Sequence, residues 1–417
     1  MIALEDAIAI TRASARVLPA EEVALHDALG RVLARTVHSP MDLPPFDNSA
    51  MDGFALRASD GLADGDEFDV TGEQAAGDGA RPAGAGAWEI MTGARVPDGF
   101  DAVIPVEEAG VLARDAAGRP TRIRLESGVR CGQHLRRRGQ DIAQGELAVQ
   151  AGLLLGPAEV MLLGGIGVAA VSVRKRPRVA LLCTGRELVD APEAALAAGH
   201  IYNTNGPYLA ARLMLAGADV VLRTTVPDQA EAFVQVVGEA LALGVDAIIS
   251  TGAVSMGRYD FVPDALRTLG GEVLFHKVRM RPGKPLLLAR LPCGTLCFGL
   301  PGNPVSSAVG ERFFVEAALR VMLGMPAEPP WRLPLLAEAP KKPGIAMFQK
   351  ACLEIAADGG VGVRLLQGQE SFRTRPLLES RAWALLPADA WLIAAGTLID
   401  VHPLGHTEAP LLRGLSP

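Results

Sequence analysis

The chain has 417 residues, of which 49% are hydrophobic and 21% charged, and its formal net charge is -7 at pH 7. This length exceeds what one hydrophobic core usually supports, so we expect a globular protein of several domains. The acidic balance excludes a general nucleic-acid binder, because such a protein needs a basic face to neutralise phosphates. Any anion site must therefore be a local cluster of cations.

Cysteine use and the apolar segments indicate the compartment. The five cysteines are odd in number, scattered and free of Cys-x-x-Cys spacing, which predicts reduced thiols rather than disulfides or a zinc site. The N-terminus carries acids where a secretory signal carries bases. The longest apolar stretch, 151–173, is interrupted by Pro157, Glu159 and glycines, so we interpret it as a short buried helix, a glycine turn and a strand. The sequence thus predicts a cytoplasmic protein with no membrane partner.

The N-terminal third contains two kinds of pattern. Residues 3–38 carry apolar side chains at roughly helical spacing and become strand-like at 31–34. From 46 to 146 the chain is rich in glycine, with short β-like runs such as 102–106 and 121–125. This spacing predicts a compact β module inserted into the N-terminal domain.

After residue 177 strands and helices alternate, which predicts a doubly wound, mostly parallel sheet covered on both faces. Such sheets bind ligands beyond the carboxyl ends of their strands. A proline-rich linker is expected at 326–334, followed by a small β domain. The expected strands are 179–183, 219–222, 247–250, 285–288 and 296–299, and the expected helices are 204–216, 228–243, 260–269 and 304–323.

A basic segment stands out in this acidic chain. Lys277, Arg279, Arg281 and Lys284 place four fixed cations within eight residues, and a Gly-Leu-Pro-Gly-Asn-Pro-Val-Ser turn follows at 299–306. The prolines and glycine of the segment stiffen and turn the backbone, so the cations can be aimed. The segment predicts a pocket for a compact, multiply charged anion; the alternative is a solvated basic loop.

Two loops follow expected strands of this sheet. Residues 251–260 form a glycine-rich loop that opens a helix, where free backbone N–H groups suit a phosphate. The alternative is a tight turn in which Asp260 caps the helix. Thr184 to Glu187 end the first strand, so their polar side chains are expected at the same edge.

Further polar motifs lie in the β module. Residues 44–55 combine two prolines with closely spaced Asp, Asn, Ser and Asp, and the motifs 91–94 and 136–142 add a hydroxyl, a triple arginine and a carboxylate. Ordinary turns and a solvated edge are the alternative interpretations of these motifs.

Together with Ile201–Asn205, these motifs resemble, in order and spacing, the molybdopterin molybdenumtransferases, which include bacterial MoeA and the E domain of gephyrin. The resemblance is strong over residues 3–325. It implies an α/β multidomain fold with an elongated N-terminal α/β domain, an inserted β module, a molybdopterin-binding sheet domain and a C-terminal β domain. The expected boundaries are 1–45 plus 142–176, 46–141, 177–325 and 326–417.

The resemblance also implies a transferase reaction, in which molybdenum from molybdate enters adenylylated molybdopterin and AMP is released with the help of Mg²⁺ or another divalent cation. It implies a homodimer whose cleft lies between the sheet domain of one subunit and the β module of the other. Molybdopterin adenylyltransferase and apo-molybdoenzymes are the protein partners to expect.

Matching motif positions assign site residues. The catalytic set implied is Asp52, Thr92, Asp141, Glu187, Asp228 and Asp260, with Asp52 and Asp260 as metal ligands. The substrate set implied is Gly252, Ser255, Lys277, Arg281, Lys284, Asn303, Pro304 and Ser306. Ser371 and Arg373 match loosely as further molybdate candidates. Arg186, Ala253 and Arg258 depart from the family pattern, and two of these changes add positive charge.

Two other functions remain open from the sequence. A non-catalytic molybdopterin carrier or scaffold would keep the anion pocket but would not need the whole acid set. A nucleotide pyrophosphatase with the same sheet domain would leave Asp52 and Asp141 unexplained. The complete acid set favours the enzyme.

Overall fold

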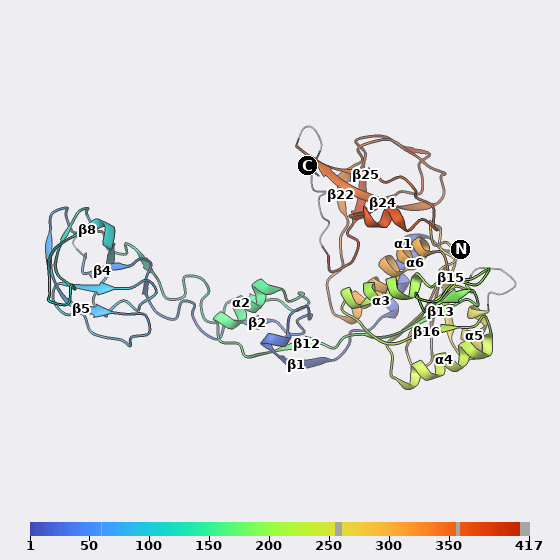
Figure 1. Cartoon of the computed structure of the whole chain (residues 1–417), viewed down its shortest axis with the longest axis horizontal. Helices are drawn as coiled ribbons and strands as arrows, with labels where there is room; N and C mark the ends of the chain where they lie inside the picture. Colours follow the sequence, from blue (N-terminus) through green and yellow to red (C-terminus); the bar gives the residue numbers. More distant parts are fainter. Residues whose placement is uncertain (60, 255–260, 356–358, 409–417) are drawn as a thin grey trace.

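A computed structural model describes the chain except residues 60, 255–260, 356–358 and 409–417. The molecule is elongated (Figure 1). A β module lies at one end and a narrow middle part follows it. The large sheet and the C-terminal β domain lie together at the other end. The described helices include none long and apolar enough to cross a membrane.

The N-terminal helix belongs to the large end of the molecule. Helix α1 (Leu4–Ser14) buries Leu4, Ala7 and Thr11 on one face, at the spacing of successive helical turns, and contacts α7 (Glu316–Met322). The helical pattern ends at Ser14, earlier than expected, because β1 (Ala20–Ala24) begins the middle part.

Short paired strands build the middle part. β1 pairs antiparallel with β12 (Ala170–Arg174), and β2 (Val37–His38) with β11 (Leu147–Val149). The expected helix, turn and strand at 151–173 are present, with α2 at Pro157–Gly165. The expectation that this helix is buried was wrong: of its residues only Leu163 is buried, and Met161 is 77% exposed.

The β module contains a six-stranded sheet of order β7-β4-β6-β5-β9-β8. Its inner side chains include Phe54, Ile104 and Ile123. Gly53 is required for close approach, because a Cβ there would lie 1.9 Å from the carbonyl oxygen of Ile104 in the next strand. The strands are β4 (Gly53–Leu56), β5 (Glu67–Gln74), β6 (Ala87–Ile90), β7 (Ala102–Pro105), β8 (Ala109–Arg114) and β9 (Pro120–Leu125), and β3 (Asn48–Ser49) pairs with β10 (Leu135–Arg136) nearby.

The large sheet confirms the expected doubly wound architecture. Its strand order is β16-β13-β17-β21-β20-β18, and the first four strands are mutually parallel. β20 is antiparallel to both neighbours. The expected strand at 285–288 begins two residues later, and β18 was not expected. The strands are β13 (Arg178–Thr184), β16 (Asp219–Val226), β17 (Ala247–Thr251), β18 (Glu272–His276), β20 (Leu287–Arg290) and β21 (Leu296–Leu300).

Two hydrophobic cores cover the two faces of this sheet. Along β13, Val179 and Leu181 enter one core while Ala180 and Leu182 enter the other, as strand alternation requires. The first core packs against α1, α3 (Asn205–Leu215), α6 (Pro304–Gly310) and α7, and the second against α4 (Ala230–Ala242) and α5 (Val262–Thr268). A π-helical turn, Glu311–Val315, joins α6 to α7.

The C-terminal domain is built of strands, as expected. The linker is shorter than expected because β22 (Trp331–Pro334) occupies its last four residues. The basic segment contributes an unexpected strand: β19 (Met280–Arg281) pairs in parallel with the start of β24 (Ala346–Ile355). The two domains therefore share backbone pairing. The other strands are β23 (Ala339–Pro340), β25 (Val361–Leu365), β26 (Ala382–Leu386), β27 (Leu392–Ile393) and β28 (Leu398–His402).

Candidate functional site

Loops that follow four parallel strands meet in one cleft of about 420 Å³ at the carboxyl edge of the large sheet. β13, β16, β17 and β21 all end at this edge, so the loops after them converge, as the topology predicts. This acidic cleft is lined by Thr184, Gly185, Arg186, Glu187, Pro227, Asp228, Gln229, Gly252, Ala253 and Gly302.

Two carboxylates of the expected catalytic set line the acidic cleft. Asp228 accepts a 3.2 Å hydrogen bond from the backbone N–H of Arg186. The carboxylate of Glu187 folds over Gly185, where a Cβ would lie 2.8 Å from Oε1. Gly185 has a φ of 152°. The backbone of this turn therefore places Glu187 and Asp228 on the same cleft wall.

The loop after β17 approaches the β13 end closely. At Gly252, with φ 91°, a Cβ would lie 2.7 Å from Oγ1 of Thr184, so only glycine fits. Ala253 also adopts a left-handed conformation, with φ 52°, which is unusual for a residue with a Cβ. A glycine would adopt this conformation without the steric cost of a Cβ. Ser255, Arg258 and Asp260 lie outside the described residues.

The Ile201–Asn205 motif supports the acidic cleft from behind. Asn205 Nδ2 donates a 2.7 Å hydrogen bond to the carbonyl oxygen of Gly302. Asn203 Nδ2 donates to Asp190 at 2.9 Å, while Asn203 Oδ1 accepts from the N–H of Gly206 at 2.9 Å. These amides fix the loops around the cleft.

The basic turn lies at the same edge and opens into a second cavity of about 710 Å³, the anion pocket. Arg281, Lys284 and Ser306 line it, and both cations are exposed while Ser306 is buried. Lys277, with φ 68°, does not line this cavity. Arg279 lines a separate cavity of about 590 Å³, together with Glu5. Only two of the four cations, Arg281 and Lys284, therefore line the anion pocket.

Two residues of the expected substrate set, Asn303 and Pro304, lie at the start of α6, the helix that carries Ser306. The carbonyl oxygen of Asn303, the N-cap of α6, accepts a 3.0 Å hydrogen bond from the N–H of Ser307, and Pro304 is the first helical residue. Neither lines the anion pocket or the acidic cleft. They instead hold Ser306 toward the anion pocket.

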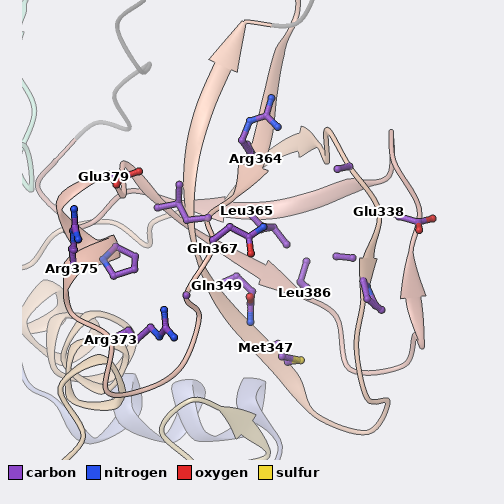
Figure 2. Close-up of a pocket in the computed structure, with 16 residues that line it drawn as sticks. Glu338, Met347, Gln349, Arg364, Leu365, Gln367, Arg373, Arg375, Glu379 and Leu386 are labelled. Carbon is purple, nitrogen blue, oxygen red and sulfur yellow. The ribbon is translucent and has the colours of Figure 1, made fainter. Parts of the chain in front are cut away.

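The C-terminal domain supplies a wall of the anion pocket that the sequence did not indicate. Met347, Gln349, Gln367 and Gln369 line it beside the loosely matched Ser371. Gln349 and Gln367 also line an adjoining cavity of about 690 Å³. Figure 2 shows Arg373, Arg375 and Glu379 on one side of that cavity and Glu338 on the other. Arg373 forms an ion pair with Glu370 at 3.1 Å.

In the β module, Asp52 and Thr92 are joined directly. Asp52 Oδ1 accepts a 2.7 Å hydrogen bond from the backbone N–H of Thr92. This bond, with one from the Thr92 side chain, holds the pKa of Asp52 below its usual value. Both residues are exposed. Asp141 is also exposed, and its backbone N–H donates to the carbonyl oxygen of Leu43 at 2.9 Å.

Two members of the triple arginine are not simply solvated. Arg137 pairs with Asp47 at 2.6 Å, and the backbone N–H of Arg138 donates to Asp47 at 2.8 Å. The Arg138 guanidinium pairs with Asp42. The backbone N–H of Gln144, followed by the Arg138 guanidinium, holds the pKa of Asp42 below its usual value. Burial raises the pKa of Asp47, but the hydrogen bonds from Arg138 and Arg137 together outweigh it and keep that pKa low as well. Asp47, in the 44–55 motif, therefore fixes the positions of Arg137 and Arg138.

Known proteins resemble the chain over nearly its whole length. Residues 2–167 match the MoeA N-terminal region (domain I and II), and residues 180–321 match a probable molybdopterin binding domain. A molybdopterin molybdenumtransferase of Synechococcus elongatus is 37% identical over 396 residues, which cover 93% of this chain and 95% of that protein. The chain belongs to the molybdopterin molybdenumtransferase family.

Other members of the family agree. The molybdopterin molybdenumtransferase of Haemophilus influenzae is 31% identical, over 93% of this chain and 94% of that protein. The crystal structure of the molybdopterin biosynthesis MoeA protein of Pyrococcus horikoshii superposes with a TM-score of 0.79 at 26% identity, covering 97% of this chain and all of that one (100%). The whole architecture of the chain is thus that of the molybdopterin molybdenumtransferase family.

In a single chain, the candidate residues of the β module lie far from those of the large sheet. Asp52 and Thr92 belong to the β module at one end of the molecule, whereas Glu187 and Asp228 lie on the large sheet at the other (Figure 1). A single subunit therefore does not bring all the expected catalytic residues together.

A divalent cation at this site would need ligands from the substrate as well as from the protein. Among the residues that the structure describes, no group of three or more His, Cys, Asp or Glu side chains could hold a metal ion by itself. Mg²⁺ is typically bound by one or two carboxylates together with substrate phosphates and water. Glu187 and Asp228 fit that limited role, and Asp52 could join them only from another subunit.

Proposed function

We propose that the chain inserts molybdenum from molybdate into adenylylated molybdopterin, releasing AMP and the molybdenum cofactor. One observation carries the proposal: the 301–306 turn borders two sites of opposite character. Gly302 lines the acidic cleft, and Ser306 lines the anion pocket. A reaction between an oxyanion and a pyrophosphate-bearing pterin requires such neighbouring sites.

The anion pocket suits molybdate. Molybdate is a compact dianion, and Arg281 and Lys284 supply two cations next to the hydroxyl-bearing Ser306. The dithiolene sulfurs of the substrate take the molybdenum, so the cysteines of the chain need not take part. Arg281, Lys284 and Ser306 bind and orient the oxyanion.

The acidic cleft suits the pyrophosphate. Three glycines, Gly185, Gly252 and Gly302, line the cleft, so no side chain at these positions keeps phosphate oxygens away from the main chain. A divalent cation bound there would neutralise the pyrophosphate. Glu187 and Asp228 would hold that cation and orient the phosphates so that AMP leaves.

The remaining acids require a second subunit. We propose a homodimer in which Asp52, Thr92 and Asp141 of one β module complete the cleft of the other sheet domain. Asp260 and Ser255 are proposed for the same cleft from their motif positions. Molybdopterin adenylyltransferase and apo-molybdoenzymes are the proposed supplier and recipients.

One assay separates this function from the alternatives. Adenylylated molybdopterin is incubated with the protein, with and without molybdate, and AMP release and cofactor formation are followed together. The proposed transferase forms cofactor and AMP in step when molybdate is present. A carrier binds the pterin without AMP release, and a pyrophosphatase releases AMP without forming cofactor; either result would overturn the proposal.

A further inference from the structure

The surface around the Asp52–Thr92 pair carries three exposed apolar side chains. Met51 precedes Asp52 and Met91 precedes Thr92, and the two methionines are 38% and 42% exposed. Val106 is 47% exposed, and its N–H donates a 3.0 Å hydrogen bond to the carbonyl oxygen of Asp52. Met51, Met91 and Val106, the apolar rim, therefore lie around one exposed carboxylate.

The strand ladder of the β module brings the rim together. β4 lies between β6 and β7, and its pairing with both strands begins at Gly53. Asp52 therefore has Met91, just after β6, on one side and Val106, just after β7, on the other. The turn that follows is open, since Gly93 has a φ of 79° and a Cβ there would meet no atom within 4 Å. The rim is thus accessible to whatever approaches Asp52.

The composition of the rim suits a flat ring. Exposed hydrophobic residues scattered singly over a surface need no explanation, whereas a group of them beside a polar site marks a contact surface. Ile90, directly before Met91, is fully buried, so the core of the module begins one residue inward from the rim. Two of the three rim residues are methionines, whose flexible side chain and polarisable sulfur make favourable contacts with aromatic rings.

The acidic cleft lacks such a surface. The described residues that line it include no aromatic side chain and no aliphatic one larger than proline. Adenylylated molybdopterin carries two flat rings, the pterin and the adenine, and ligand sites hold such rings through apolar contact as well as a few polar anchors. The β module lies far from this cleft within one chain (Figure 1). In the proposed homodimer, the rim enters the partner's cleft together with Asp52.

We propose that the apolar rim binds a flat heteroaromatic ring of the nucleotide substrate, with Met51 and Met91 packing on the ring. This inference rests on the proposed function and its homodimer. It assigns substrate contact to side chains that carry no charge and transfer no proton. Adenine and pterin share the chemistry that the rim recognises, so the experiment must separate the two.

The test replaces the two methionines by a polar and by an apolar residue of similar size. Met51→Gln/Met91→Gln removes the apolar contact, and Met51→Leu/Met91→Leu keeps it. Leu112→Gln is the matched control, because Leu112 is 44% exposed on β8, a strand that does not pair with β4. Calorimetry on the full-length protein measures the binding of adenylylated molybdopterin, AMP, molybdopterin and inorganic pyrophosphate, which has no ring.

The double Gln variant is expected to bind adenylylated molybdopterin about tenfold more weakly, the loss of two sulfur–ring contacts. A matching loss for AMP identifies the adenine as the bound ring, and a matching loss for molybdopterin identifies the pterin. Pyrophosphate affinity should stay within about twofold of wild type, as should all affinities in Leu112→Gln. The double Leu variant should recover most of the ring affinity. Because the side chains are exposed, melting temperatures should stay within about 2 °C.

Several results would overturn the inference. These are unchanged binding of both AMP and molybdopterin in the double Gln variant, an equal loss of pyrophosphate binding, or a loss in the double Leu variant as large as in the Gln variant. Sedimentation velocity adds one more: a dimer that dissociates in the Gln variant would make the rim a protein contact.

The coupled assay keeps this inference separate from the proposed function. A wild-type protein that binds neither AMP nor molybdopterin and forms no cofactor defeats the proposed function. A wild-type protein that forms cofactor, with the double Gln variant matching it in the KM for adenylylated molybdopterin, defeats the rim inference alone. The KM for molybdate should be the same in both proteins, since molybdate has no ring.

Discussion

Asp52 Oδ1 and the backbone N–H of Thr92 are joined by a 2.7 Å hydrogen bond on the exposed surface of the β module. The two residues come from motifs forty positions apart that the family resemblance placed in one catalytic set. The bond fixes the orientation of an exposed carboxylate on the module. Its orientation toward solvent is consistent with a ligand or a second subunit as its target.

Asp52→Asn is therefore expected to reduce molybdenum insertion by about 100-fold or more, the usual cost of losing a catalytic acid or base. Because the carboxylate is fully exposed, the melting temperature should stay within about 2 °C of wild type. Asp64→Asn, at another exposed aspartate of the module, is the matched control. Wild-type turnover in Asp52→Asn would exclude a catalytic role.

The same bond sets the pH dependence of Asp52. Its pKa is held below the usual value, so the carboxylate is ionised from mildly acidic to alkaline pH. The stability that this bond contributes is present above the unfolded pKa near 3.8 and is lost as pH falls through the lower folded pKa. Asp52 therefore does not titrate above about pH 5. If the rate falls as the pH is lowered toward 5, another group causes that fall, and the same pH–rate profile should be measured for Asp52→Glu.

A shared cleft predicts complementation between subunits. Asp52→Ala and Asp228→Ala homodimers should each be inactive, because each cleft lacks one acid. A mixed dimer has one cleft free of both lesions, so mixing the two variants should restore up to about a quarter of the activity, half of the clefts in half of the dimers. Tagged pull-down must show that subunits exchange. Exchange without recovered activity would mean that each cleft is built from one chain.

Arg279 and Lys284 line different cavities, which makes Arg279 a control for Lys284. Lys284→Gln should raise the molybdate concentration needed for turnover by about tenfold to a hundredfold, the loss of a charge-assisted contact of about 1.5–3 kcal/mol. Arg279→Gln should change it by less than about twofold, because Arg279 lines the other cavity. Equal effects of the two substitutions on the molybdate KM would indicate a diffuse field rather than a specific pocket.

The carboxyl-edge loops were the most predictable part of the site. Continuous apolar strands separated by helices require a parallel sheet, and the ends of parallel strands meet at one edge. Thr184, Glu187 and Gly252 could therefore be placed together from the sequence pattern alone, whereas Asp228 was assigned only through the family resemblance. The pairing of Asp52 with Thr92 was reachable only through the family resemblance, since nothing local links residues forty positions apart.

The C-terminal wall could not be predicted in the same way. Gln349 and Lys350 lie in a strand whose apolar neighbours indicate an ordinary β segment, and polar residues there carry no motif. The pairing of Met280 and Arg281 with β24 depends on how two domains pack, which sequence periodicity does not report. The strained conformation of Ala253 was hidden for a related reason: an alanine gives no sign of a positive φ.

Two buried glutamates near the end of α6 allow a final prediction about stability. Burial, and then the charge of Glu316, raise the pKa of Glu311 well above its usual value. Glu316, five residues later, is paired with Arg212 at 3.0 Å and with Arg312 at 3.4 Å, and it accepts a 2.8 Å hydrogen bond from the N–H of His406. Glu316→Gln should lower the free energy of unfolding by about 3–5 kcal/mol, because it breaks a buried ion network.

Glu311→Gln should behave in the opposite way. A carboxyl group with a raised folded pKa binds its proton more tightly in the native state, so it loses stability as pH rises from the unfolded pKa toward the folded one. Glutamine does not titrate, and the variant should therefore gain stability relative to wild type between pH 5 and pH 8. Urea unfolding at both pH values measures this difference. A difference that stays constant with pH, or a loss at pH 8 as large as that of Glu316→Gln, would show that Glu311 is ionised and paired in the native protein.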